Sequence, residues 1–292
     1  MRRPYPLPEP FRDGAFTSET AQASGVHPER LRRADLDVPF RSVRTTGITS
    51  FEQLCLAYAE RMSARQFFCG MTAAQLIGLR FPLSALSRGV HVGTASRAPR
   101  AAEVHGHQLP VSTPVIILHS GLRVSAAIDT WCQLAARLRL DEVIAMGDGL
   151  VERQDPVATT GQLIAAVAGW KNRPGAVLLR AALPEICSRT DSARETILRL
   201  LIVRAGFPEP EVNLAISDQF GNFIGFADLA YPAQKVIFEY DGGHHRTESQ
   251  YHADIDRLDR FMEAGWRVIR VNKSLMSRPS DLFAKARKAL AG

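Results

Sequence analysis

The chain has 292 residues, of which 46% are hydrophobic, and it carries a formal net charge of +6. This length predicts two domains with ordinary apolar cores. The sequence has no run of about 18 or more apolar residues, which argues against a transmembrane helix, and its N-terminal stretch lacks the apolar segment of a secretory signal. Four widely spaced cysteines without a C-x-x-C pair argue against a zinc site or a disulfide framework, so we expect a protein of the reducing cytoplasm.

The positive charge is unevenly distributed. Residues 191–292 contain 14 basic and 14 acidic side chains, so residues 1–190 carry the whole excess, with 22 basic against 16 acidic. Such an excess is compatible with contacts to nucleic-acid phosphates. Basic surfaces are also common in proteins without such a ligand, so the charge alone does not select a partner.

The N-terminal region combines a loose segment with a helix-turn-helix pattern. Residues 1–12 are rich in proline and are predicted to be loose. Two short helices around Gly25 are predicted over 16–36, the second over 27–33, and a strand follows over 38–44. A winged helix of this kind contacts DNA phosphates through basic side chains. The candidates are Arg30, Arg32, Arg33, Arg41 and Arg44. The alternative is a small helical module whose basic face contacts another protein.

The middle of the chain alternates helices and strands. A helix that ends near residue 80 is predicted to start at Thr72 as its cap. The pair His105-Gly106-His107 has the form of a metal-binding motif, but Glu103 is its one acidic neighbour, so a solvated loop is predicted there. Apolar periodicity predicts further helices over 51–62, 125–138 and 140–150, and strands over 89–93 and 115–119.

The amino-acid sequence of this region resembles a known family. The matching stretches are FFCGMTAAQLIGL, RGVHV and SGLRVSAAIDTWCQLAARLRLDEVIAMGDGLV. Over residues 13–150 they are similar to the winged-helix and C-terminal regions of abortive-infection type IV antitoxins. The resemblance implies a mostly helical, winged-helix-containing module that binds DNA or regulates its neighbour. Residues 151–189, punctuated by prolines, are predicted to form a helical connector.

The C-terminal region, residues 190–292, predicts a different fold. Ser192 is a candidate helix N-cap, and a helix is expected from there to residue 205. A strand over 211–217 and a hairpin over 224–240 follow, then a helix over 251–264. A strand over 266–271 and a helix over 281–290 complete the order α-β-β-β-α-β-α. The whole chain is therefore predicted to be an α/β protein of two domains.

Acidic residues interrupt the hairpin strands where apolar residues are expected. Asp228 lies in the first strand, Glu239 in the second, and Asp241 ends the second. Unpaired carboxylates are costly to bury, and carboxylates gathered at the ends of adjacent strands repel one another unless a cation lies between them. A hard divalent ion with oxygen ligands fits such a site, so Mg²⁺ is predicted, with Mn²⁺ able to substitute. The alternative is that Asp228 and Glu239 are structural and pair with Arg267, Arg270 or a backbone turn.

Four flanking residues extend the candidate site. Glu195 is three residues after the N-cap, where it either completes a capping box or faces the acidic cluster. Asp254 and Arg257 share a helix face, so they form a surface ion pair or buttress the site. His245 follows a Gly-Gly turn that can aim an imidazole into the site as a general base, and an exposed turn histidine is the alternative.

These residues together resemble a nuclease family. Glu195, FADLAY, FEYDGGHH, the D-x-x-R of Asp254 and Arg257, and GWRVIRVN match, in order, the very-short-patch-repair-like endonuclease domain family (domain of unknown function 559), which has the restriction-endonuclease-like fold. The resemblance implies that Asp228, Glu239 and Asp241 bind Mg²⁺ while Glu195 and His245 assist. An E-x-D motif replaces the commoner E-x-K, so positive charge must come from another residue. The candidates are Lys235, Arg246, Arg257 and Lys273.

The sequence therefore supports three hypotheses. The first is a Mg²⁺-dependent endonuclease that hydrolyses phosphodiester bonds of double-stranded DNA and is targeted by its N-terminal module. The second is a DNA-binding transcriptional regulator of the antitoxin type that keeps the nuclease-like domain as a scaffold. The third is a protein-interaction module. A homodimer is expected if both DNA strands are cut, and the sequence leaves the oligomeric state open.

Overall fold

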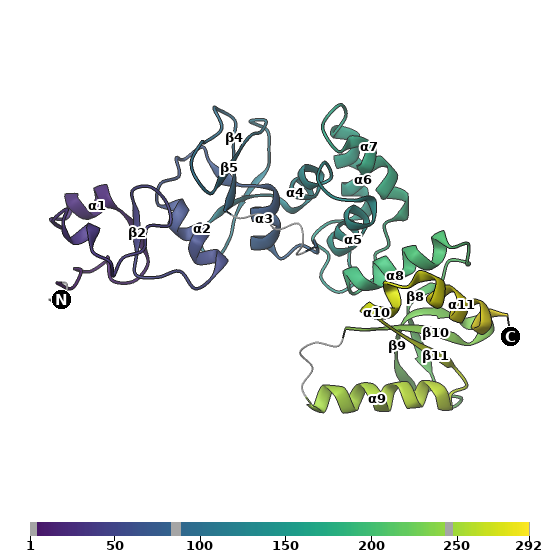
Figure 1. Ribbon diagram of the computed structural model, residues 1–292. Coiled ribbons are helices and arrows are strands. Elements are labelled where there is room, and N and C mark those ends of the chain that lie inside the picture. The colour runs from purple at the N-terminus through teal and green to yellow at the C-terminus, as the bar shows by residue number, and fades with distance from the viewer. Residues whose placement is uncertain (1–4, 83–88, 243–247, 292) are drawn as a thin grey trace. The chain divides into compact units, whose positions relative to one another are not determined.

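The structure is a computed structural model that describes residues 5–82, 89–242 and 248–291, with the side chains of 248–251 left out. It is a mixed α/β protein. The chain forms two compact units, residues 1–134 and 135–292, and each is described by itself (Figure 1). In the described part of the chain, no helix combines the length and apolar character needed to cross a membrane.

The first unit begins with a small module around a two-stranded sheet. Strands β1 (Ala15–Thr17) and β2 (Val43–Thr45) pair antiparallel, and helix α1 (Ser18–Ala23) follows β1. The second helix that the sequence predicted over 27–33 is wrong: a single 3-10 turn, η1 (Arg30–Arg32), occupies this stretch. Of these residues, Leu31 alone is buried, so a helix here would have no apolar face to pack.

The rest of the first unit is built on a mixed five-stranded sheet in the order β5-β4-β3-β7-β6. The β3–β7 and β4–β5 pairs are parallel, and β3–β4 and β6–β7 are antiparallel. The strands are β3 (Phe67–Phe68), β4 (Val90–Thr94), β5 (Val104–Gln108), β6 (Val115–Ile117) and β7 (Arg123–Ser125). The helices are α2 (Phe51–Ala59), α3 (Gly70–Ile77) and α4 (Ala127–Leu134).

Two predictions for this sheet are wrong. Thr72 does not cap its helix, because α3 starts two residues earlier and the Thr72 hydroxyl accepts a 2.8 Å hydrogen bond from the His91 backbone N–H. The stretch His105-Gly106-His107 is not a loop but part of β5. There His107 Nε2 lies 2.9 Å from Nδ1 of His91 on the paired strand β4.

Four helices open the second unit. They are α5 (Leu140–Leu150), α6 (Thr160–Gly169), α7 (Ala176–Ala182), which the 3-10 turn η3 (Leu183–Glu185) continues, and α8 (Ala193–Arg204). A buried carboxylate, Asp148 of α5, accepts hydrogen bonds from the Cys187 N–H at 2.7 Å and from the hydroxyls of Thr190 and Thr196 at 3.1 and 2.7 Å. It therefore ties α5 to α8, and residues 140–185 belong to the same compact unit as the sheet that follows.

A four-stranded sheet in the order β11-β10-β9-β8 forms the centre of this unit. Its strands are β8 (Glu211–Ser217), β9 (Phe223–Tyr231), β10 (Val236–Asp241) and β11 (Arg267–Asn272). The pairs β8–β9 and β9–β10 are antiparallel, and β10–β11 is parallel. A 3-10 turn, η4 (Pro232–Gln234), joins β9 to β10. Helices α9 (Glu248–Glu263), α10 (Lys273–Met276) and α11 (Pro279–Leu290) complete the fold.

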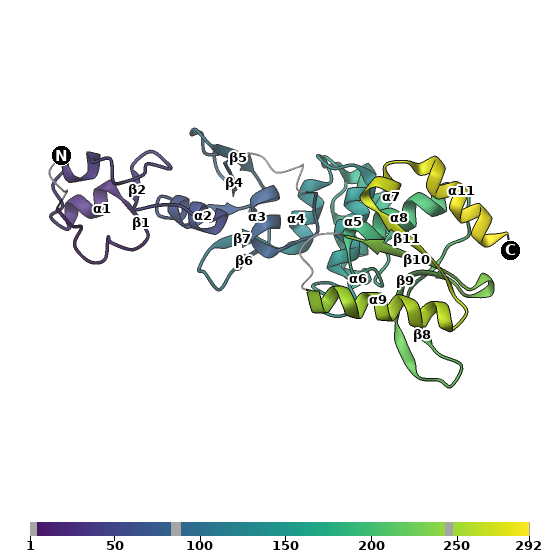
Figure 2. The ribbon, with the colours of Figure 1, turned by 60° about the horizontal axis from the view of Figure 1, so that its bottom comes forward.

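The sheet is covered on both faces (Figures 1 and 2). On one face Leu198 of α8 and Leu282 of α11 pack against Phe238, and on the other Leu258 and Phe261 of α9 pack against Ile237. Alternate residues of β10 thus point into opposite cores, as the period of a strand requires. The predicted order α-β-β-β-α-β-α is present, with the short helix α10 added after β11.

Candidate functional site

The two principal acids lie where the pairing of β9 and β10 ends. The last backbone pair is Phe238 with Leu229, so Asp228 and Glu239 are the next residues on the two strands. The Asp228 N–H donates to Glu239 Oε1 at 3.2 Å, and the Tyr240 N–H donates to Asp228 Oδ2 at 2.7 Å. Each carboxylate thus takes the place of a missing backbone partner, and the two strands hold the acids face to face.

Burial dominates the electrostatics of this pair. The Glu239 side chain is 7% exposed and Asp228 is partly buried. Burial raises the pKa of Asp228 well above its ordinary value, and the charges of Glu239 and then Glu195 raise it further. Burial also raises the pKa of Glu239, against the opposing effect of Arg257. The site therefore favours either a proton or a bound cation near these two acids.

Arg257 of α9 supplies positive charge directly to the pair. Its guanidinium donates to Glu239 Oε2 at 2.9 Å and to the Phe226 carbonyl at 2.9 Å, and it lies 3.5 Å from Asp254 Oδ1. The ion pair of Asp254 and Arg257 predicted from their spacing is therefore present. Gly225 makes room for this arm, since a Cβ there would lie 2.8 Å from Arg257 Cδ.

Glu195 is buried beside the start of its helix. Its Oε2 accepts a hydrogen bond from the Asp191 N–H at 2.7 Å and another from Asn213 Nδ2 at 3.1 Å. The Ser192 hydroxyl accepts from the Glu195 N–H at 3.2 Å, so Ser192 is the N-cap as predicted, although the reciprocal bond comes from Asp191 and not from Ser192. Glu195 is close enough for its charge to raise the pKa of Asp228.

The remaining predicted residues are distributed differently. Asp241 ends β10 and pairs with Arg270 of β11, with Oδ2 and Nη2 2.5 Å apart. Arg270 therefore pairs with Asp241, and Glu239 has Arg257 as its partner, so the predicted pairing of Glu239 with Arg267 or Arg270 is wrong. Backbone partners, the other part of that alternative, are present, because both carboxylates accept backbone N–H groups. His245, together with the neighbouring His244 and Arg246, lies outside the described residues.

The lysines are placed at the two ends of the strands. Lys235 adopts a left-handed conformation just before β10, at the end opposite to Asp241, and its ammonium group donates to the Ala264 carbonyl at 3.3 Å. Lys273 begins α10, directly after the end of β11. Of the three candidates that the structure describes, Arg257 is thus the one that contacts an acid of the pair.

The carboxylate oxygens of this site are of the kind that a hard cation binds, but they do not form a complete coordination shell. Within the described ranges, no three His, Cys, Asp or Glu side chains are arranged to hold a metal ion together. Asp228 and Glu239 offer carboxylate oxygens with raised pKa values, which fit Mg²⁺ or Mn²⁺ because such ions bind oxygen and displace protons from it. The described residues therefore account for two ligands.

Two of the five arginines predicted to contact DNA are engaged within the first unit. Arg30 forms a two-pronged ion pair with Asp35 at 2.8 and 3.0 Å and donates to the Tyr5 carbonyl at 2.6 Å. Arg44 donates to the carbonyls of Leu31 and Val43. The other three side chains, those of Arg32, Arg33 and Arg41, are exposed.

Sequence reasoning missed two residues that hold the site. Asn213 of β8 has a φ of 47° and bridges Glu195 to the Arg189 carbonyl, at 3.1 and 2.6 Å. Asp148 anchors α8, and its burial raises its pKa. A lone acid within the apolar run VIAMGDGLV was a signal for Asp148. An asparagine in a strand gives no comparable signal.

Comparison with known proteins gives distant matches. The "uncharacterized protein Rv2248" and the "uncharacterized protein MT2308", from two strains of Mycobacterium tuberculosis, are each 27% identical to this chain over 151 residues. The match covers 51% of this chain and 55% of each relative, so the chain spans about half the length of these curated relatives. No family model matches the chain. No solved structure matches it either.

Proposed function

We propose that the second unit is a Mg²⁺-dependent phosphodiesterase of the restriction-endonuclease-like type that acts on DNA. The observation that carries the proposal is the Asp228–Glu239 pair, held face to face at the point where β9 and β10 separate. The sheet order β11-β10-β9-β8, with helices on both faces, is consistent with that fold class. The resemblance of residues 190–292 to the very-short-patch-repair-like endonucleases supports the same proposal.

Each residue has a defined role in this proposal. Asp228 and Glu239 hold the cation, which when bound supplies Lewis-acid charge at the phosphate and lowers the pKa of the attacking water. Arg257 supplies the positive charge that the E-x-D motif lacks, because its guanidinium already contacts Glu239. Asp254 orients Arg257. Glu195, Asp241 and His245 are proposed to assist, with His245 preparing the water.

A cleavage assay tests this proposal. Supercoiled plasmid and labelled 40-mer duplexes are incubated with the protein and Mg²⁺ or Mn²⁺, and nicked and cut products are separated on gels. Asp228→Asn is expected to abolish cleavage, since the amide cannot hold the cation, while Asp259→Asn, a neutralisation of an exposed acid on α9, is expected to keep it. Equal cleavage by the wild type and Asp228→Asn would refute the proposal.

A second function is favoured by one specific observation. Glu239 already has a cationic partner within the protein, Arg257 at 2.9 Å, which is what a retained scaffold would need. The chain would then be a DNA-binding regulator of the antitoxin type. This alternative predicts binding to DNA in EDTA that Asp228→Asn and Glu239→Gln leave unchanged, together with no cleavage by the wild type under any cation.

A further inference from the structure

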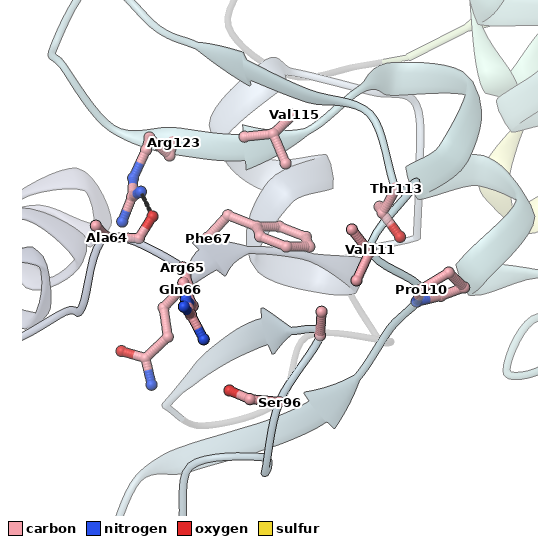
Figure 3. A pocket seen from close by; sticks show the side chains of 11 residues that line it. Ala64, Arg65, Gln66, Phe67, Ser96, Pro110, Val111, Thr113, Val115 and Arg123 are labelled. Atoms are coloured by element: carbon pink, nitrogen blue, oxygen red, sulfur yellow. Dashed lines mark hydrogen bonds between the residues drawn. The ribbon is translucent and has the colours of Figure 1, made fainter.

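The first unit contains a cleft that the proposed function does not use. It has a volume of about 540 Å³ and lies between β3, β6, β7 and the segments 95–96 and 110–113 (Figure 3). This volume is within the range of pockets that bind small organic ligands, roughly 300–1,000 Å³. The residues that line it all belong to the first unit.

An apolar surface forms part of the cleft. Figure 3 shows the ring of Phe67 extending toward Val111, with Val115 above the ring in this view. Val111 is 88% exposed and Val115 is 40% exposed. The ring rests on Gly93 of the adjacent strand, where an added Cβ would lie 2.8 Å from Phe67 Cε2. The absence of a side chain at Gly93 thus gives the ring its position, and two exposed valines face a concave space that a flat apolar surface can fill.

The same part of the chain carries a marked positive charge. Residues 61–123 contain seven arginines, no lysine and a single acid, Glu103. Arg65 and Arg123 line the cleft, and Arg97 directly follows its residue Ser96. Arg123 donates to the carbonyls of Ser63, at 2.6 Å, and Ala64, which fixes the segment that leads into β3.

Arg65 and Arg97 are available to a ligand. Both side chains are exposed, and neither forms an ion pair with any residue that the structure describes. Side chains of Gln66, Ser96 and Thr113 add hydrogen-bonding groups to the lining. The cleft therefore combines an apolar surface that can contact a base, polar groups that can bond the edge of the base and guanidinium groups that can bind phosphates. These are the components of a nucleotide site.

We propose that this cleft binds an unpaired nucleotide of a nucleic-acid strand. The base lies against the exposed side chains of Val111 and Val115, with the largely buried Phe67 (7% exposed) as part of the lining, and the adjoining phosphates contact Arg65 and Arg97. The nucleotide must be unpaired because a duplex keeps the faces of its bases stacked and presents only phosphates and groove edges. The inference goes beyond the proposed function: it concerns binding by the first unit and holds whether or not the second unit hydrolyses its substrate.

Fluorescence anisotropy tests the proposal. A labelled 30-nucleotide single strand of DNA, its RNA counterpart and the matching DNA duplex are titrated with the full-length protein in EDTA, so that no cleavage occurs. Arg65→Ala/Arg97→Ala is compared with Arg137→Ala/Arg180→Ala, which removes the same charge from exposed positions of the second unit that have no assigned role. Circular dichroism and thermal denaturation verify that each variant is folded. Val111→Ser removes apolar surface from the cleft without changing charge.

The proposal predicts a specific pattern. Wild type binds a single strand more tightly than the duplex, and Arg65→Ala/Arg97→Ala weakens this binding about tenfold or more, with a salt slope smaller by about 1.4 for two lost phosphate contacts. Val111→Ser weakens single-strand binding and leaves duplex binding unchanged. The DNA and RNA arms show which sugar the cleft accepts.

Three outcomes would overturn the proposal. Equal losses in the two double variants would show that net charge alone drives binding. Tighter binding of the duplex, or no binding of a single strand, would exclude an unpaired nucleotide as the ligand of the cleft. Equal competition by polyglutamate would assign the cleft to an acidic peptide. Each of these results is independent of cleavage, so failure here is distinct from failure of the proposed nuclease activity.

Discussion

Replacing Arg257 with alanine removes the cationic partner of a buried carboxylate. Glu239 is 7% exposed at its side chain and Arg257 27%, so water replaces little of the lost interaction. Removing one member of a fully buried pair costs about 3–5 kcal/mol, and the partial exposure of Arg257 reduces this to about 2–3 kcal/mol. This loss of about 2–3 kcal/mol includes the hydrogen bond to the Phe226 carbonyl. For a unit of this size the loss corresponds to a melting temperature lower by roughly 5–10 °C.

The loss of stability in Arg257→Ala is expected to depend on pH. Burial raises the pKa of Glu239 above its unfolded value, and Arg257→Ala removes the main influence that lowers it, so the folded pKa rises further. A carboxyl group whose pKa is higher in the folded than in the unfolded protein contributes its full stabilisation at pH values below its unfolded pKa. That stabilisation is lost as the pH rises through its folded pKa. The destabilisation by Arg257→Ala is therefore largest at pH 8 and shrinks as the pH falls toward 5.

Differential scanning calorimetry at several pH values measures this effect. Arg260→Ala is the matched control, because Arg260 is about one turn further along α9, is exposed and donates to the Phe223 carbonyl, with no ion pair among the described residues. Arg257→Ala in a Glu239→Gln background should cost less than in the wild type, since a neutral amide needs no cation. A loss below about 0.5 kcal/mol, or a loss that is the same at pH 5 and pH 8, would refute the assigned role of the pair.

Three further predictions follow from the same contacts. Asp228→Asn keeps an acceptor for the Tyr240 N–H while removing a buried charge, so unfolding at pH 8 should show a stability gain of about 1 kcal/mol or more, which disappears at low pH. Asp148→Ala removes a buried acceptor that three donors share, and urea denaturation should show a loss of about 2–4 kcal/mol. Gly225→Val places carbon atoms where Arg257 lies, so calorimetry should show a pH-dependent loss like that of Arg257→Ala, whereas Gly242→Val, whose added Cβ meets only Tyr240 at 3.8 Å, should not.

The sequence was most informative where local pattern and tertiary packing agree. The strands of the second unit are short apolar runs bounded by turns, and α5 was predicted with the bounds it has in the structure, Leu140–Leu150. Asp228 and Glu239 could be selected because acids interrupt those runs. Their register could not be read from the sequence, since it depends on where β9 and β10 cease to pair.

Predictions failed where distant residues decide the local structure. The stretch around His105 was predicted to be a solvated loop because Glu103 is the one acidic neighbour of its H-x-H pair, but its backbone pairs with β4. Gly106 has no side chain because a Cβ there would lie 2.1 Å from the Pro99 carbonyl oxygen, a close approach that only the fold reveals. The ion pair of Arg257 with Asp254 was predicted from helical spacing and is present, but the contact of Arg257 with Glu239 crosses from α9 to β10 and does not follow from that spacing.

The most direct test of the central claim is calorimetric titration of Mn²⁺ into the wild type and into Asp228→Asn/Glu239→Gln. If these two carboxylates hold the catalytic cation, the wild type will show saturable binding and the double variant will show none. Asp259→Asn, the exposed control, should bind as the wild type does. Binding that persists unchanged in the double variant, or no binding in any of the three proteins, would contradict the assignment of the cation to Asp228 and Glu239.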